Sequence, residues 1–121
     1  MHCDVSGFTA MSESLAARGR EGAELMVEVL NSFFGRMLEI ADGYGGVQMK
    51  FGGDAMLLYF EGDAHAHRAA ASGLAMQGAM KPFAKLPVAG ETYALRMRAG
   101  IHSGRFFSAS TGDPKTLLHY V

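Results

Sequence analysis

The stretch from Val47 to Phe60 reads VQMKFGGDAMLLYF and predicts a β-hairpin. Two apolar runs of strand length flank Gly52-Gly53, and adjacent glycines accept the positive φ angles of a tight turn. Lys50 and Asp54 therefore lie near the tip of this hairpin. A carboxylate that opens an otherwise apolar strand loses hydration unless a cation or hydrogen-bond donors meet it. Asp54 is thus either a candidate metal ligand or a residue that merely supports the turn.

The composition indicates one soluble globular domain spanning residues 1–121. The formal net charge is -1 and 49% of the residues are hydrophobic, which is ordinary for a globular protein. Lys and Arg residues do not cluster, so an electrostatic footprint for nucleic acid is missing. No apolar run approaches the roughly 18 residues that a membrane span needs. Cys3 is the single cysteine and no leader pattern is present, so we expect a cytoplasmic protein without an internal disulfide.

A first strand is predicted over residues 1–5, and Ser6-Gly7-Phe8-Thr9 then turns the chain into a helix. Side chains alternate along a strand, so His2 and Asp4 would share one side of the sheet. The backbone N–H groups of residues 5–9 would converge at the helix N-terminus, where free donors and the helix dipole favour a phosphate. The alternative is an ordinary capped helix with Asp4 hydrogen-bonded to the turn.

Apolar spacing predicts helices over residues 8–17, 21–41 and 64–80. In the second helix, Met and Phe side chains recur at intervals of three and four, so this stripe faces the core rather than a cofactor. Asp63 is predicted to cap the third helix. His65 and His67 stand two residues apart and do not share a helix face. A zinc site is therefore not expected there, and both histidines are predicted to lie at the surface.

Beyond the third helix, the sequence predicts a connection over residues 86–91 and a strand over residues 93–102. Alternation in that strand puts its apolar side chains on one face and Arg96 and Arg98 on the other. Phe106 and Phe107 are candidates for the start of another strand. The Gly-Asp-Pro sequence at residues 112–114 predicts a loop, and residues 117–121 form a last apolar segment.

The order of strand, two helices, hairpin, helix and strand predicts an α+β fold, a ferredoxin-like α/β sandwich with a central, mostly antiparallel sheet. In that topology the first strand lies between the second strand of the hairpin and the later strand. Asp4 would then stand beside Asp54. Two carboxylates at one end of adjacent strands, next to a loop of free amides, suit one or two hard divalent cations that hold a nucleoside triphosphate.

Four short motifs resemble, in order and spacing, the catalytic domain of class III adenylate/guanylate cyclases. They are Asp4-Val5-Ser6-Gly7-Phe8-Thr9, Tyr44-Gly45-Gly46, Lys50-Phe51-Gly52-Gly53-Asp54-Ala55 and Gly100-Ile101-His102-Ser103-Gly104. The resemblance covers nearly the whole chain. It implies a fold of the class III cyclase type that is incomplete at its C-terminal end.

The resemblance also implies roles for particular residues. Asp4 and Asp54 would be catalytic and, together with Val5, would bind two Mg²⁺ or Mn²⁺ ions per site. The substrate-binding residues would be Val5, Ser6, Gly7, Phe8 and Thr9, whose amides hold the β- and γ-phosphates, with Gly53 and the base-recognising Lys50. A lysine at this position is similar to the adenine-selecting choice of the family, in which a glutamate goes with guanine.

The reaction implied by the resemblance converts ATP into 3′,5′-cyclic AMP and pyrophosphate, as a lyase in signal transduction. The ribose 3′ oxygen would attack the α-phosphorus with the help of two metal ions. The family forms a head-to-tail homodimer whose sites lie at the interface. Lys50 would therefore act in the site of the partner protomer.

Two departures from the family pattern bear on this expectation. Val121 stands where the family has a second base-reading Asp or Thr, and a valine side chain cannot hydrogen-bond. The family's ribose-orienting Asn and its transition-state Arg lie on the helix that would follow, and Asn31 is the only asparagine here. We therefore expect residues 1–121 by themselves to be inactive.

Other functions remain open from the sequence. A degenerate cyclase-like module would bind nucleotide or dimerise within a larger regulatory protein, without catalysis. A diguanylate cyclase shares the Gly-Gly-Asp turn, but its signature continues with a catalytic acid where Ala55 and Met56 follow here.

Overall fold

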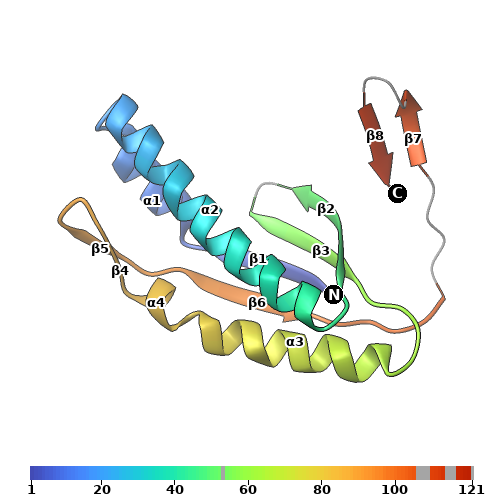
Figure 1. Cartoon of the computed structure of the whole chain (residues 1–121). Coiled ribbons are helices and arrows are strands. Elements are labelled where there is room, and N and C mark those ends of the chain that lie inside the picture. The colour runs from blue at the N-terminus through green and yellow to red at the C-terminus, as the bar shows by residue number, and fades with distance from the viewer. Residues whose placement is uncertain (53, 106–109, 114–116, 121) are drawn as a thin grey trace.

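A four-stranded antiparallel sheet with the order β2-β3-β1-β6 organises the fold (Figure 1). The computed structural model describes residues 1–52, 54–105, 110–113 and 117–120. The strands of the sheet are β1 (His2–Ser6), β2 (Val47–Gly52), β3 (Ala55–Tyr59) and β6 (Arg96–Gly100). Strand β1 lies between the second strand of the hairpin and the later strand, which confirms the predicted topology and fold class.

The helices pack against one side of this sheet. They are α1 (Phe8–Ala16), α2 (Arg20–Gly43), α3 (His65–Ala79) and the short α4 (Lys81–Ala84). Figure 1 shows α2 and α3 running across the same side of the strands. The core side chains of the sheet alternate with exposed ones, as a sheet covered on one face requires. The buried strand residues are Cys3, Val5, Met56, Leu58 and Met97, and they meet Phe33, Met37 and Met76 of the helices.

A cluster of aromatic rings fixes the start of α1 against α2 and α4. The Phe8 and Phe33 ring centroids lie 5.7 Å apart, and those of Phe33 and Phe83 lie 5.1 Å apart, both in edge-to-face geometry. Such pairs contribute about 0.5–1.5 kcal/mol beyond the area that they bury. The predicted Met and Phe stripe of the second helix is thereby confirmed as core, because Phe33 and Met37 are fully buried.

The region after α3 differs from its prediction. Residues 86–91 are not a plain connection, because β4 (Leu86–Val88) pairs with β5 (Glu91–Tyr93) in a small hairpin. Its turn has two consecutive positive φ angles, 52° at Ala89 and 85° at Gly90. Ala89 is not the asparagine, aspartate or glycine that a two-residue hairpin turn prefers at its first position, so the pattern predicted only a connection. The strand predicted over residues 93–102 is therefore divided between β5 and β6, and Arg96 and Arg98 are exposed beside buried Met97, as predicted.

Two further local predictions were wrong. Asp63 does not cap α3, because the helix begins at His65 and Ala64 occupies the N-cap position in the left-handed region without a side-chain hydrogen bond. Gly112 and Asp113 do not form a loop but belong to β7 (Ser110–Asp113), which pairs with β8 (Leu117–Tyr120). Phe106, Phe107, Pro114 and Val121, for which other expectations were stated, lie outside the described residues.

Candidate functional site

The two candidate metal aspartates lie at the same end of adjacent strands. Asp4 of β1 is paired in register with Ala55 of β3, the residue that follows Asp54. The amide of Val5 donates a hydrogen bond of 2.9 Å to the backbone carbonyl of Asp54. Both aspartates are exposed, with 60% of the Asp4 side chain accessible. The structure therefore brings together the two residues that the predicted topology had placed side by side.

Asp4 has two polar neighbours, one on its own strand and one on β6. His2 shares its side of β1, as predicted, and His2 Nδ1 lies 3.7 Å from Asp4 Oδ2. Arg98 is the register partner of Asp4 on β6, the strand that flanks β1 opposite β3. Strand alternation predicts Arg98 on the polar face of its strand but indicates no function for it. The signal was available, because the predicted strand order already put this strand beside Asp4.

The turn between β1 and α1 requires glycine. Gly7 has a φ of 101°, and a Cβ at this position would overlap the carbonyl oxygen of Ala94. Helix α1 starts directly after it without a side-chain cap, so the N–H groups of its first turn lack intrahelical acceptors. The amide of Val5 is engaged by Asp54. The Val5 amide is therefore not available to a phosphate. The amides around Gly7, Phe8 and Thr9 remain candidates for phosphate binding.

A β-bulge places Lys50. Gln48 and Lys50 pair with the consecutive residues Leu58 and Leu57, so Met49 is the extra residue in β2. Bulges bend a strand and redirect its side chains. Lys50 consequently pairs with Leu57, which is 42% exposed, and lies on the exposed side of the sheet. Gly53, the other predicted substrate-binding residue of this hairpin, lies outside the described residues.

Lys50 lines a cavity of about 650 Å³ at the end of the sheet where β3 leads into α3. Its apolar lining includes Met49, Leu57 and Phe60, and its polar lining includes Glu61 and Ser103. Among the described lining residues neither Asp4 nor Asp54 is present. Within the described residues the two aspartates thus lie at the same end of adjacent strands, whereas Lys50 lines a cavity whose lining does not include them.

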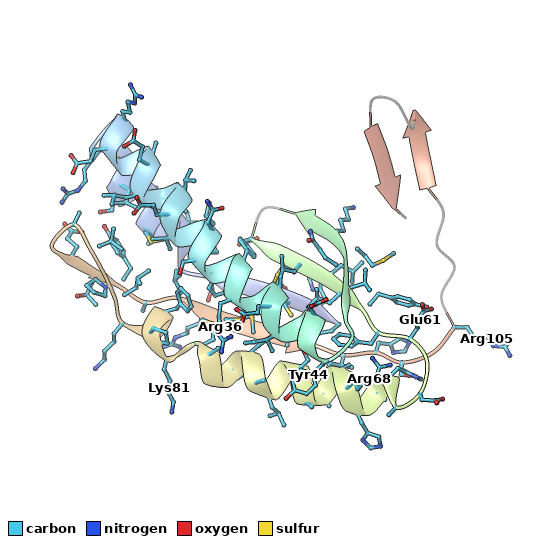
Figure 2. All side chains as sticks on the ribbon, viewed as in Figure 1. Arg36, Tyr44, Glu61, Arg68, Lys81 and Arg105 are labelled. Carbon is cyan, nitrogen blue, oxygen red and sulfur yellow. The ribbon has the colours of Figure 1, made fainter. Side chains whose placement is uncertain are left out.

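Arg68 of α3, for which no role was predicted, holds the loop that contributes Glu61 to this cavity. Its guanidinium donates hydrogen bonds to the carbonyl oxygens of Tyr44 (2.9 Å), Asp63 (3.0 Å) and Glu61. Figure 2 shows Arg68 between Tyr44, at the end of α2, and Glu61, in the loop after β3. One side chain therefore joins the turn before β2 to the loop before α3. Nothing in the local sequence pattern marks an arginine whose acceptors are distant backbone groups.

The donor set fits a magnesium-type ion. Asp4 and Asp54 offer hard carboxylate oxygens, and no group of three or more His, Cys, Asp or Glu side chains gathers within the described part of the chain. Mg²⁺ keeps several waters and is bound through one or two carboxylates together with substrate phosphates, rather than by a complete protein cage. Two exposed aspartates beside an uncapped helix N-terminus match that requirement.

Cys3 lies next to Asp4 in sequence but is not a second reactive group. The thiol is fully buried on the core side of β1. Burial raises the pKa of Cys3 above its ordinary value, and the nearby N-terminal ammonium offsets this only in part. The side chain therefore stays protonated and packs as a small apolar residue.

The chain matches the model of the adenylate and guanylate cyclase catalytic domain over residues 1–120. It belongs to this family. Among curated relatives, the adenylate cyclase type 10 of Rattus norvegicus is 46% identical over 59 residues, which are 47% of this chain and 4% of the relative. The human adenylate cyclase type 10 matches to the same extent.

Solved structures agree with the family. The adenylyl cyclase CyaB from P. aeruginosa superimposes with a TM-score of 0.76 and 31% identity, covering 99% of this chain and 61% of that one. The guanylate cyclase domain of RhGC from Catenaria anguillulae, solved in complex with GTP, gives a TM-score of 0.74 and 26% identity, covering 99% and 62%. The chain thus spans about three fifths of these structures. None of the helices in the described residues combines the length and hydrophobicity of a bilayer span.

Proposed function

We propose that this domain is an adenylate cyclase that converts ATP into 3′,5′-cyclic AMP and pyrophosphate. The observation that carries the proposal is the register of β1 and β3, which puts Asp4 and Asp54 at the same end of these two adjacent strands. The glycine turn and uncapped start of α1 lie directly after β1. Carboxylates for cations and free amides for phosphates are the two requirements of a nucleoside triphosphate site.

Each residue has a distinct part in the proposed reaction. Two Mg²⁺ or Mn²⁺ ions held by Asp4, Asp54 and the Val5 backbone would activate the ribose 3′-hydroxyl and neutralise charge on the leaving pyrophosphate. The amides around Gly7 donate to the phosphates as negative charge builds on them. Arg98, the register partner of Asp4 on β6, adds a positive charge next to this site. Lys50 donates a hydrogen bond to an acceptor on the adenine ring.

The proposed active form is a head-to-tail homodimer. The support is that the Lys50 cavity of one chain includes neither Asp4 nor Asp54 among its described lining. A nucleotide held by the aspartates of one protomer would reach the Lys50 of its partner. Each protomer then contributes the metal ligands to one site and the base contact to the other.

A catalytically silent, nucleotide-binding or dimerising module is the second candidate. The observation that favours it is Val121, whose side chain cannot hydrogen-bond to a base. Such a module would retain nucleotide binding without turnover.

Product formation by the full-length protein distinguishes these functions. With Mn²⁺ and ATP we expect cyclic AMP, and Asp54→Ala should lower kcat by about 100-fold or more, as loss of a preorganised charge-stabilising group does. Asp42→Ala, which removes an exposed carboxylate from α2, should leave the rate unchanged. Tight nucleotide binding without any cyclic product would instead support the silent module.

A further inference from the structure

The cavity lined by Lys50 has the size and the lining expected of a site for a heteroaromatic ring. Its volume of about 650 Å³ lies within the range of about 300–1,000 Å³ that small-molecule sites occupy. The buried side chains of Phe60 and Ala69 form part of its apolar lining, and Met49 adds a polarisable thioether. Thioethers make favourable contacts with aromatic rings. A heteroaromatic ring therefore matches this lining better than a phosphate chain does.

The charges around the cavity also favour the base of a nucleotide over its phosphates. Glu61 lines the cavity and would repel a triphosphate. The candidate metal ligands Asp4 and Asp54 and the start of α1 are not among its described lining residues. The cavity thus suits the base end of a nucleotide, while the phosphates belong beside Asp4, Asp54 and the start of α1.

A hydrogen-bonded pair, His65 and Ser103, lines the same cavity as Lys50. His65 Nδ1 lies 3.1 Å from the carbonyl oxygen of Gly62, and His65 Nε2 lies 2.7 Å from Ser103 Oγ. A carbonyl oxygen can only accept, so in the neutral imidazole Nδ1 carries the proton and Nε2 is the acceptor. The Ser103 hydroxyl then donates a hydrogen bond to His65 Nε2. Its remaining lone pairs make Ser103 an acceptor toward a ligand.

We propose that Ser103, oriented by His65, is a second base-reading residue that accepts a hydrogen bond from the 6-amino group of adenine. This inference rests on the proposed function, in which Lys50 donates to the neighbouring ring nitrogen of the same base. A donor at one position and an acceptor at the next match the edge of adenine. Guanine presents the reverse order, an acceptor oxygen beside an N–H donor. Ser103 would thus supply the polar contact that Val121 cannot make through its side chain.

The test compares two nucleotides that differ only in the 6-amino group. Calorimetry with Mn²⁺ measures the Kd of 3′-deoxy-ATP and of 3′-deoxypurine riboside triphosphate for the full-length protein, since neither can be cyclised. We expect the adenine form to bind about three- to tenfold more tightly, the contribution of one neutral hydrogen bond. Ser103→Ala should bring this ratio to about one, Ser103→Thr should keep it, and His65→Ala should reduce it.

The controls separate this inference from the function on which it rests. His67→Ala, at an exposed position of the same helix that does not line the cavity, should leave the ratio unchanged. Lys50→Ala should weaken both nucleotides alike, since both keep the ring nitrogen. A ratio of one in the wild type, or an unchanged ratio in Ser103→Ala, would overturn the role of Ser103. Unchanged affinities in Lys50→Ala would instead contradict the proposed base contact of Lys50.

Discussion

At the scale of single residues, Gly7 makes the turn between β1 and α1 possible. Its φ of 101° and the nearby carbonyl of Ala94 exclude a Cβ. Gly7→Ala should therefore lower the free energy of unfolding by at least about 1–3 kcal/mol. Gly35→Ala is the matched control, because this exposed helical glycine has open space around it, and it should stabilise the protein by up to about 1 kcal/mol. Urea denaturation measures both, and equal changes in the two variants would contradict this account of the turn.

Ser72 carries a polar group that the fold does not need, so its replacement should not destabilise the protein as that of Gly7 does. Its hydroxyl is fully buried in α3 and has no hydrogen-bond partner among the residues that the structure describes. Because an unsatisfied hydroxyl costs about 1–3 kcal/mol to bury, Ser72→Ala should leave stability unchanged or increase it by about 1 kcal/mol. Thermal unfolding followed by circular dichroism is the measurement. A clear loss of stability would show that the hydroxyl contributes to the native state.

At the scale of elements, Arg68 holds two connections with one guanidinium. Arg68→Lys keeps the charge but cannot donate to three carbonyls in the same planar geometry. We expect a loss of about 1–3 kcal/mol in stability, with faster hydrogen exchange at residues 44–46 and 61–64. Arg36→Lys serves as the control, since Arg36 forms only an exposed ion pair with Glu39 among the contacts described for it, and such pairs contribute about 0–1 kcal/mol. If hydrogen exchange in the Arg68 variant changed equally throughout the protein, Arg68 would not specifically join these two segments.

Sequence patterns predicted the elements well where local rules decide them. The hairpin around Gly52, the helix stripe and the adjacency of Asp4 and Asp54 follow from periodicity and from strand order. The bulge at Met49 was missed because no glycine or proline marks it. The β4–β5 hairpin was missed although Gly90 lies in its turn, because its strands have only three residues each and Ala89 occupies the first turn position.

The environment of the site was less predictable for another reason. The three acceptors of Arg68 are backbone carbonyls on other segments, and the Ser103 hydroxyl meets a histidine 38 residues away. Contacts of this kind depend on the finished packing of α3 against the sheet. A residue-type pattern contains no information about them.

At the scale of the whole molecule, a substitution of Lys50 tests the base contact that this residue makes in the proposed dimer. Lys50→Glu replaces a donor with an acceptor and should shift the ratio of kcat/KM from ATP toward GTP by about tenfold or more. Lys85→Glu makes the same charge change at an exposed position between α4 and β4 and should not alter the preference. An unchanged preference in the Lys50 variant would mean that this lysine is only a solvated charge on the hairpin.

Complementation gives a second test of the same assembly. A mixture of Asp54→Ala and Lys50→Glu proteins can form heterodimers in which one of the two sites has both native residues. If the sites lie between protomers, the mixture should recover activity toward about one quarter of the wild-type value, since about half of the dimers are mixed. Neither variant alone should show this activity. Absence of recovery from a mixture shown to exchange subunits would contradict the arrangement in trans.

The central claim is that Asp4 and Asp54 form one metal site, and a double-mutant cycle tests it most directly. Calorimetry measures Mn²⁺-dependent binding of 3′-deoxy-ATP to the wild type, Asp4→Ala, Asp54→Ala and the double variant. Two ligands of the same ions should be coupled by about 1–3 kcal/mol, so the double variant should be barely weaker than either single one. Losses that simply add, or wild-type affinity in either single variant, would contradict a shared site.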